Sequence, residues 1–135
     1  MIFLIVDDSR PTRNLLKNYI SEIVHNPYDD YLEAEDGETA LHMLKSRPID
    51  FVFLDIHLST KITGLALTGM DILKEIRKID KFKQLPIIMV TSDSDKCNVV
   101  DAIKFGANAF VVKPIDKQAF AEKVLKVMKS VGLTK

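Results

Sequence analysis

The chain has 135 residues, of which 47% are hydrophobic, and its 19 basic and 19 acidic side chains cancel. This length fits one domain with one core, and the hydrophobic content lies well above the range of disordered proteins. A net charge near zero argues against a general nucleic-acid or anionic-membrane binder, because such proteins carry a basic excess.

The single cysteine, Cys97, cannot form an internal disulfide, which favours a reducing, cytoplasmic location. No apolar run approaches the roughly 20 residues of a membrane span, so we expect no membrane insertion. Residues 2–6 run directly into acidic residues and do not resemble a secretory leader. Neither end reads as a linker, so we expect one domain over residues 1–135 without an output domain of its own.

Five short apolar runs have the length and composition of β-strands. Four of them are unbroken, which is typical of strands buried on both faces of a parallel sheet. The fifth is short and carries a charge, as an edge strand does. The runs cover residues 2–6, 31–34 (the charged one), 51–55, 87–90 and 109–112.

The segments between these runs carry helix signals. They include Ser9 or Asp8 as a first cap, Asp36 and Gly69 as helix openers, Gly106 as a closing glycine and Asp116 as a last cap. The lysines of the last helix, Lys123 among them, crowd its carboxyl half, where the helix dipole favours cations. Strand and helix therefore alternate five times. Parallel strands joined in this way need right-handed crossovers, which predicts an α/β, doubly wound, three-layer domain.

Polar side chains follow four of the strands at the edge of the sheet where ligands of such folds bind. Asp7 and Asp8 follow the first strand, Asp55 ends the third, and Thr91 and Lys113 follow the fourth and fifth. Clustered carboxylates repel one another unless a cation neutralises them or one takes a proton. These hard oxygen ligands suit Mg²⁺ or Mn²⁺, and the lysine and the hydroxyl can bind phosphate oxygens. The set indicates a carboxylate nucleophile for a phosphoryl group.

The sequence resembles the receiver domain of two-component response regulators, in its single-domain, chemotaxis-type form. The matching residues are Asp7-Asp8, Glu35-Asp36-Gly37, Asp55, Thr91-Ser92 and Lys113-Pro114, in this order and each beside the corresponding strand. The resemblance extends from about residue 2 to residue 131. It implies a flavodoxin-like sheet of five parallel strands in the order 2-1-3-4-5.

The resemblance also implies roles for individual residues. Asp55 would accept a phosphoryl group, with Lys113 in contact with it. Asp8, Asp55 and the backbone carbonyl of His57 would ligate Mg²⁺, with Asp7 acting through metal-bound water. Thr91 would move to bind the phosphoryl group, Phe110 would swing inward behind it, and the bond before Pro114 would be cis.

The implied partners are a histidine kinase or phosphotransfer protein as phosphodonor and a downstream protein target. This target would bind the surface of the fourth helix, fifth strand and fifth helix. We expect no nucleic-acid partner, a monomer or weak dimer, and no enzymatic activity beyond the protein's own phosphorylation and dephosphorylation.

The chain departs from the family pattern in three places. His57-Leu58-Ser59 stands where a proline is usual, Phe110 replaces a common tyrosine, and Gly69 comes later than the usual spacing after Asp55. The long segment 56–68 holds Ile62, Leu65 and Leu67, which are too apolar for a solvated loop. Two interpretations stay open: the segment orders on activation or partner binding, or it is a passive insertion, which loops accept at small cost.

Three other functions compete with this interpretation. A haloacid-dehalogenase-type phosphohydrolase needs a nucleophile and an acid two residues apart after the first strand, but Ser9 occupies the acid's position. A flavodoxin-like electron carrier needs a Ser/Thr/Gly-rich phosphate-binding loop after the first strand, which this chain lacks. The chain also has no tryptophan to stack on a flavin. A degenerate receiver would lack part of the acidic set, which is intact here.

Overall fold

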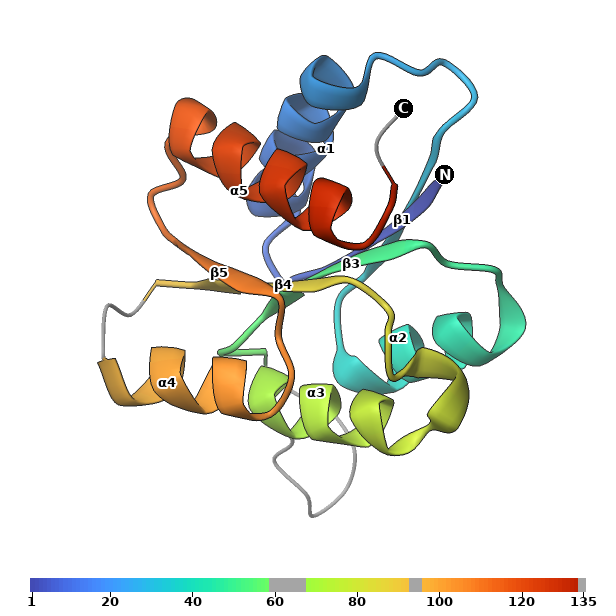
Figure 1. Cartoon of the computed structure of the whole chain (residues 1–135), viewed down its shortest axis with the longest axis vertical. Coiled ribbons are helices and arrows are strands. Elements are labelled where there is room, and N and C mark those ends of the chain that lie inside the picture. Colours follow the sequence, from blue (N-terminus) through green and yellow to red (C-terminus); the bar gives the residue numbers. More distant parts are fainter. Residues whose placement is uncertain (59–67, 93–95, 134–135) are drawn as a thin grey trace.

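The structure is a computed structural model that describes residues 1–58, 68–92 and 96–133 (Figure 1). Its strands are β1 (Ile2–Val6), β2 (Asp30–Ala34), β3 (Phe51–Asp55), β4 (Ile87–Thr91) and β5 (Ala109–Val112). Its helices are α1 (Arg10–Val24), α2 (Gly37–Ser46), α3 (Gly69–Lys78), α4 (Lys96–Lys104), α5 (Lys117–Ser130) and the short 3₁₀ helix η1 (Asp80–Phe82).

The five strands form one parallel sheet in the order β2-β1-β3-β4-β5, which confirms the predicted topology. The charged strand β2 lies at one edge and β5 at the other. Helices cover both faces, with α1 and α5 on one side and α2, α3 and α4 on the other (Figure 1). No helix in the described part of the chain is both long and apolar enough to cross a membrane.

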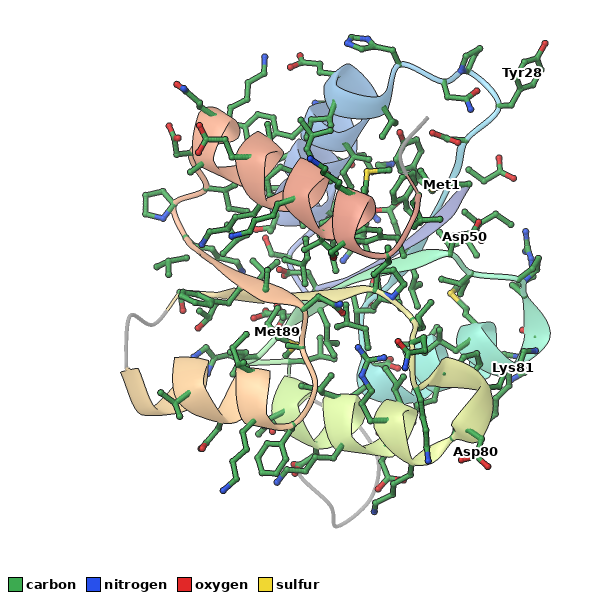
Figure 2. All side chains as sticks on the ribbon, viewed as in Figure 1. Met1, Tyr28, Asp50, Asp80, Lys81 and Met89 are labelled. Carbon is green, nitrogen blue, oxygen red and sulfur yellow. The ribbon has the colours of Figure 1, made fainter. Side chains whose placement is uncertain are left out.

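The core has two halves because successive side chains of a strand point to opposite faces of the sheet. On β3, Phe51 and Phe53 pack in the half covered by α1 and α5, and Phe53 lies 5.5 Å from the ring of Phe120 on α5. Val52 and Leu54 pack in the other half. Every residue of β3 is buried, and Met89 of the neighbouring strand lies at the centre of the molecule (Figure 2).

Side-chain caps begin the helices that position the site. Ser9, rather than Asp8, caps α1 and accepts a hydrogen bond from the Thr12 backbone N–H (3.4 Å). Asp36 and Asp116 cap α2 and α5, as the sequence predicts. These caps satisfy backbone N–H groups that have no partner inside the helix.

The apolar residues Val100 and Ile103 belong to a spacing that predicts a helix here, but α4 leaves both side chains largely uncovered. Val100 and Ile103 are 61% and 48% exposed, whereas Ala102 is fully buried. The apolar spacing therefore predicts the helix but not the face that it buries. The result is an apolar surface on α4 beside β5.

The segment after β3 is described only at its two ends. Ile56 and Leu58 are buried, and Thr68 caps α3 in a reciprocal pair with Asp71. Residues 59–67, and with them the expectations for Ile62, Leu65 and Leu67, lie outside the described residues. The described ends are tied together, because the Gly69 N–H donates to the carbonyl of Ile56 (2.8 Å).

Gly69 opens α3 directly against the carboxyl end of β3. A Cβ atom at this position would lie 1.8 Å from the backbone oxygen of Asp55 and 2.8 Å from Cα of Ile56. Backbone atoms cannot move aside as a side chain does. The absence of a side chain at Gly69 therefore allows α3 to begin beside Asp55.

We expect Gly69→Ala to lower the free energy of unfolding by about 3 kcal/mol, the upper part of the usual range for overpacking. Gly37→Ala is the matched control, because its added Cβ would meet side-chain atoms of Ile72 rather than backbone atoms, and a side chain can adjust more easily. We expect a loss of about 1 kcal/mol there. Urea unfolding of both variants measures the difference, and equal losses would contradict the explanation.

Candidate functional site

Three carboxylates meet at the carboxyl ends of β1 and β3. Asp7 and Asp8 follow β1, and Asp55 is the last residue of β3, which pairs with β1. Each of the three offers an oxygen atom, and these atoms all lie within 4.8 Å of one another. Asp7 and Asp55 are only 1% and 4% exposed, whereas Asp8 is exposed. The cluster is therefore open to solvent on one side.

Lys113 supplies a positive charge to this cluster from the end of β5. Its Nζ donates a hydrogen bond to Asp7 Oδ2 (3.0 Å) and lies 3.7 Å from Asp55 Oδ2. The Lys113 backbone N–H donates to the carbonyl of Thr91 (2.7 Å), which holds the end of β5 against β4. The Lys113–Pro114 peptide bond is cis.

Backbone N–H groups fix the orientation of the two buried carboxylates. The Ser9 N–H donates to Asp7 Oδ1 (2.8 Å), and the His57 N–H donates to Asp55 Oδ1 (3.0 Å). The second oxygen of each carboxylate faces Lys113. Each buried carboxylate thus has one oxygen held by the backbone and one facing the ammonium group.

Arg13 is a structural part of the site that the sequence interpretation missed. This side chain is 5% exposed, and its Nη1 donates to the backbone carbonyl of Asp7 (2.7 Å). Its Nε donates to Glu33 Oε1 (2.9 Å), so it joins the acidic turn to β2. Its position in the sequence could have indicated that it is buried, because Arg13 has the helical spacing that places it on the same face as Leu16 and Ile20, which are buried.

The pKa of Asp55 is raised above its usual value. Burial makes the largest contribution, and the neighbouring charges of Asp7 and Asp8 add to it, against the opposing effects of the His57 N–H and Lys113. Burial acts to lower the pKa of Lys113, but the hydrogen bond to Asp7 and the charges of the three carboxylates outweigh it and raise that pKa. The site therefore holds excess negative charge that favours a further cation.

The remaining predicted residues lie around this cluster rather than within it. Thr91 is fully buried at the end of β4. The His57 side chain is exposed, and its backbone N–H, described above, contacts Asp55. Phe110 lies on β5, is half-buried and packs against the core half that includes α4.

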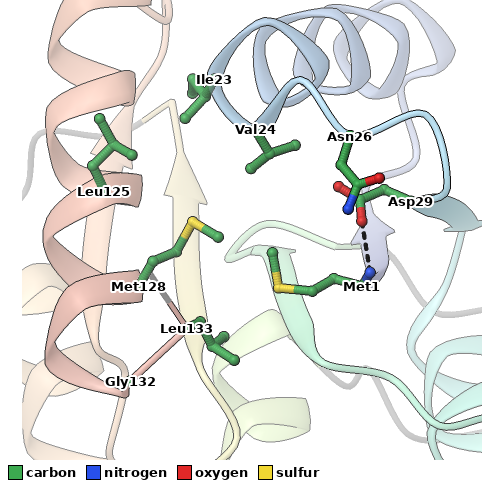
Figure 3. A pocket seen from close by; sticks show the side chains of 9 residues that line it. All are labelled: Met1, Ile23, Val24, Asn26, Asp29, Leu125, Met128, Gly132 and Leu133. Atoms are coloured by element: carbon green, nitrogen blue, oxygen red, sulfur yellow. Dashed lines mark hydrogen bonds and ion pairs between the residues drawn. The ribbon is translucent and has the colours of Figure 1, made fainter. Parts of the chain in front are cut away.

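A pocket of about 460 Å³ lies at the opposite end of the strands (Figure 3). It is lined mainly by apolar residues of α1 and α5 and by Met1, whose amino group contacts Asp29 (2.6 Å). It shares no residue with the carboxylate cluster.

Comparison with known proteins identifies the family of the chain. A sequence model of the response regulator receiver domain family matches residues 3–125. The chain belongs to this family. It is the receiver domain of a two-component response regulator, and thus a signalling protein rather than a classical enzyme.

Individual relatives agree with this assignment. Chemotaxis protein CheY of Pseudomonas aeruginosa is 34% identical over 132 residues, 98% of this chain and 99% of that protein. Chemotaxis protein CheY1 of Helicobacter pylori is 36% identical over 124 residues, 92% of this chain and 94% of that protein. The crystal structure of NtrX from Brucella abortus superposes with a TM-score of 0.81 at 28% identity, covering 98% of this chain but 27% of NtrX.

The residues of this receiver domain fit a divalent metal ion. The donor set consists of carboxylate oxygens, which Mg²⁺ and Mn²⁺ prefer, and the exposed Asp8 leaves room for the water ligands that Mg²⁺ retains. The acidic cluster is thus consistent with the divalent-metal site of receiver domains.

We expect Asp55→Asn to stabilise the metal-free protein at neutral pH. The folded-state pKa of Asp55 is raised, so the folded carboxyl binds its proton more tightly than the unfolded one. Stability is therefore lost as the pH rises from the unfolded-state pKa through the folded-state pKa, and asparagine avoids this loss. The gain should be complete above the folded-state pKa and vanish below about pH 4, where both states are protonated.

Thermal melting in EDTA across this pH range measures the effect. Asp80→Asn is the control, because Asp80 lies at the periphery on η1 (Figure 2) and its side chain forms an exposed ion pair with Lys83. Such pairs contribute little, so this variant should match the wild type throughout. An Asp55→Asn protein less stable than the wild type at pH 7 would refute the account.

Proposed function

We propose that this receiver domain is a phosphorylation-activated switch that accepts a phosphoryl group on Asp55 from a phosphohistidine. The donor is a histidine kinase or a phosphotransfer protein. The observation that carries the proposal is the buried Asp55 carboxylate, held by one backbone N–H and facing the Lys113 ammonium group among two further carboxylates.

The chemistry follows from the groups around Asp55. A carboxylate oxygen of Asp55 attacks the phosphorus atom, the P–N bond of the phosphohistidine breaks, and the imidazole keeps the electron pair and takes up a proton. The product is an acyl phosphate. Lys113 pairs with the phosphoryl oxygens, for which its place beside Asp55 suits it, and the Thr91 hydroxyl donates a further hydrogen bond.

Asp8, Asp55 and the backbone carbonyl of His57 would hold Mg²⁺, with Mn²⁺ as a possible substitute. Asp7 would act through metal-bound water, which agrees with the engagement of its two oxygens by Ser9 and Lys113. When bound, the ion supplies neutralisation of charge on the carboxylate and phosphoryl oxygens. The excess negative charge of the cluster supports this proposal.

The output surface that we propose is formed by α4, β5 and α5, where a downstream protein binds. Two observations support it. Ile103 of α4 and Val100 are exposed apolar side chains, and a groove of about 330 Å³ lies beside them, with Ile103, Phe110 and Val127 in its lining. An exposed apolar patch of this kind is typical of a protein-binding surface.

Phosphorylation of Asp55 is tested with acetyl phosphate as a small phosphodonor. In the presence of Mg²⁺ we expect the intact protein to gain the mass of one phosphoryl group. The adduct should be absent in EDTA and in Asp55→Asn, and present in the control Asp80→Asn. A stoichiometric, Mg²⁺-dependent adduct on Asp55→Asn would disprove the assignment.

The proposal includes an inward movement of Phe110 on phosphorylation of Asp55, which couples the site to the α4–β5–α5 surface. This coupling is tested by mapping backbone amide chemical shifts before and after phosphorylation. Phe110→Ala should still be phosphorylated. The chemical-shift changes that phosphorylation causes at α4 and α5 should be largely lost, because no ring remains whose movement can carry the effect from Asp55 to these helices. Phe110→Leu, which keeps most of the bulk, checks that misfolding is not the cause. Unchanged shift mapping in Phe110→Ala would rule out this route.

A further inference from the structure

Lys123 makes two contacts with Phe110 that link α5 to the edge of the sheet. Its Nζ donates a hydrogen bond to the backbone carbonyl of Phe110 (2.6 Å). The same Nζ lies 4.4 Å from the centroid of the Phe110 ring, within the range of a cation–π interaction. One ammonium group thus contacts both the backbone and the side chain of one residue.

The position of Lys123 on its helix explains this geometry. Phe120, Val124 and Val127 form the buried stripe of α5. Lys123 lies between them at the flank of this stripe, three residues after Phe120 and four before Val127, and is only half-buried. From there the long side chain reaches β5, the edge strand, and both residues line the groove between α4 and α5.

The two contacts differ in what they depend on. The hydrogen bond holds the ammonium group against the β5 backbone wherever the ring points. The cation–π contact exists only while the ring stays where it lies in this structure. Because the hydrogen bond fixes the ammonium group beforehand, the ring contact needs little further ordering of the lysine.

We propose that Lys123 is a positioning residue that holds the Phe110 ring in its half-buried place and so opposes the ring movement that accompanies activation. The inference rests on the proposed function, in which Phe110 moves inward when Asp55 is phosphorylated. A contact present in only one conformer shifts the equilibrium toward that conformer. In this proposal the conformer with the ring inward is the one that reacts with the phosphodonor. A smaller population of that conformer therefore lowers the observed rate of phosphorylation in proportion.

The contact itself is tested in the unphosphorylated protein by NMR. The ring current of Phe110 should shift the ε-methylene protons of Lys123 upfield, with nuclear Overhauser effects between these protons and the ring. Phe110→Leu should abolish the upfield shift. Lys123 ε-protons at ordinary lysine shifts in the wild type would overturn the proposal, whether or not Asp55 is phosphorylated.

The effect of Lys123 on the equilibrium between the two ring positions is tested by the rate of phosphorylation by acetyl phosphate with Mg²⁺. Lys123→Met keeps the aliphatic chain and removes the charge, and we expect a rate about two- to fivefold higher, as a partly exposed cation–π contact implies. Lys123→Arg should restore the wild-type rate, because a guanidinium group also binds an aromatic face. Lys129→Met, an exposed lysine of the same helix, controls for the change in net charge.

A double-mutant cycle isolates the ring from other effects of the lysine. In a Phe110→Leu background, Lys123→Met should no longer change the rate. An equal acceleration in both backgrounds, or the same acceleration from Lys129→Met, would overturn the proposal. A wild-type protein that forms no adduct would instead refute the proposed function, and the NMR measurement would still decide the contact.

Discussion

Repulsion among Asp7, Asp8 and Asp55 is the interaction on which this site depends. Strand pairing enforces it, because β1 and β3 are neighbours and end on acidic residues at the same edge. Burial then prevents water from screening the two inner carboxylates. Lys113 compensates part of this negative charge, and the charge that remains favours a divalent metal ion.

The surrounding structure keeps these charges together. Arg13 donates a hydrogen bond to the backbone carbonyl of Asp7 and so holds the turn that carries Asp7 and Asp8 in place. Gly69 lets α3 start against the carbonyl of Asp55, so the helix closes over the end of β3. The backbone hydrogen bond from Lys113 to Thr91 fixes the end of β5. From there the ammonium group reaches Asp55 on β3 and Asp7 after β1, two and three strands away. Each of these groups stabilises an arrangement that the carboxylates alone would oppose.

The sequence predicts the alternation of strands and helices and the acidic cluster, because these follow from local patterns. The order of the strands in the sheet is predicted only by the resemblance to the receiver family. Unbroken apolar runs indicate buried strands, and a polar residue at the end of each run must reach the same edge. The structure confirms the sheet and brings Asp7, Asp8, Asp55 and Lys113 together.

Long side chains and covered faces are harder to predict. From the sequence alone, Arg13 is a polar helix residue and Lys123 is a cation near a helix terminus. Only the structure shows which strands their side chains contact. For α4, the apolar spacing identifies the helix, but which residues are covered depends on how the helix sits on the sheet. Sequence periodicity shows which residues share a face and does not show what that face meets.

Phe110 limits how the site and the α4–β5–α5 surface can be coupled. Its side chain has no hydroxyl, so no side-chain hydrogen bond can distinguish two positions of the ring. The forces that remain are packing against the core half that includes α4 and attraction to a cation over the ring face. Packing in this half-buried place is weaker than in the full core, so a single cation–π contact would be a meaningful part of the energy difference between the two ring positions of the proposed switch. A substitution at Lys123 would then change that difference without altering the carboxylate cluster.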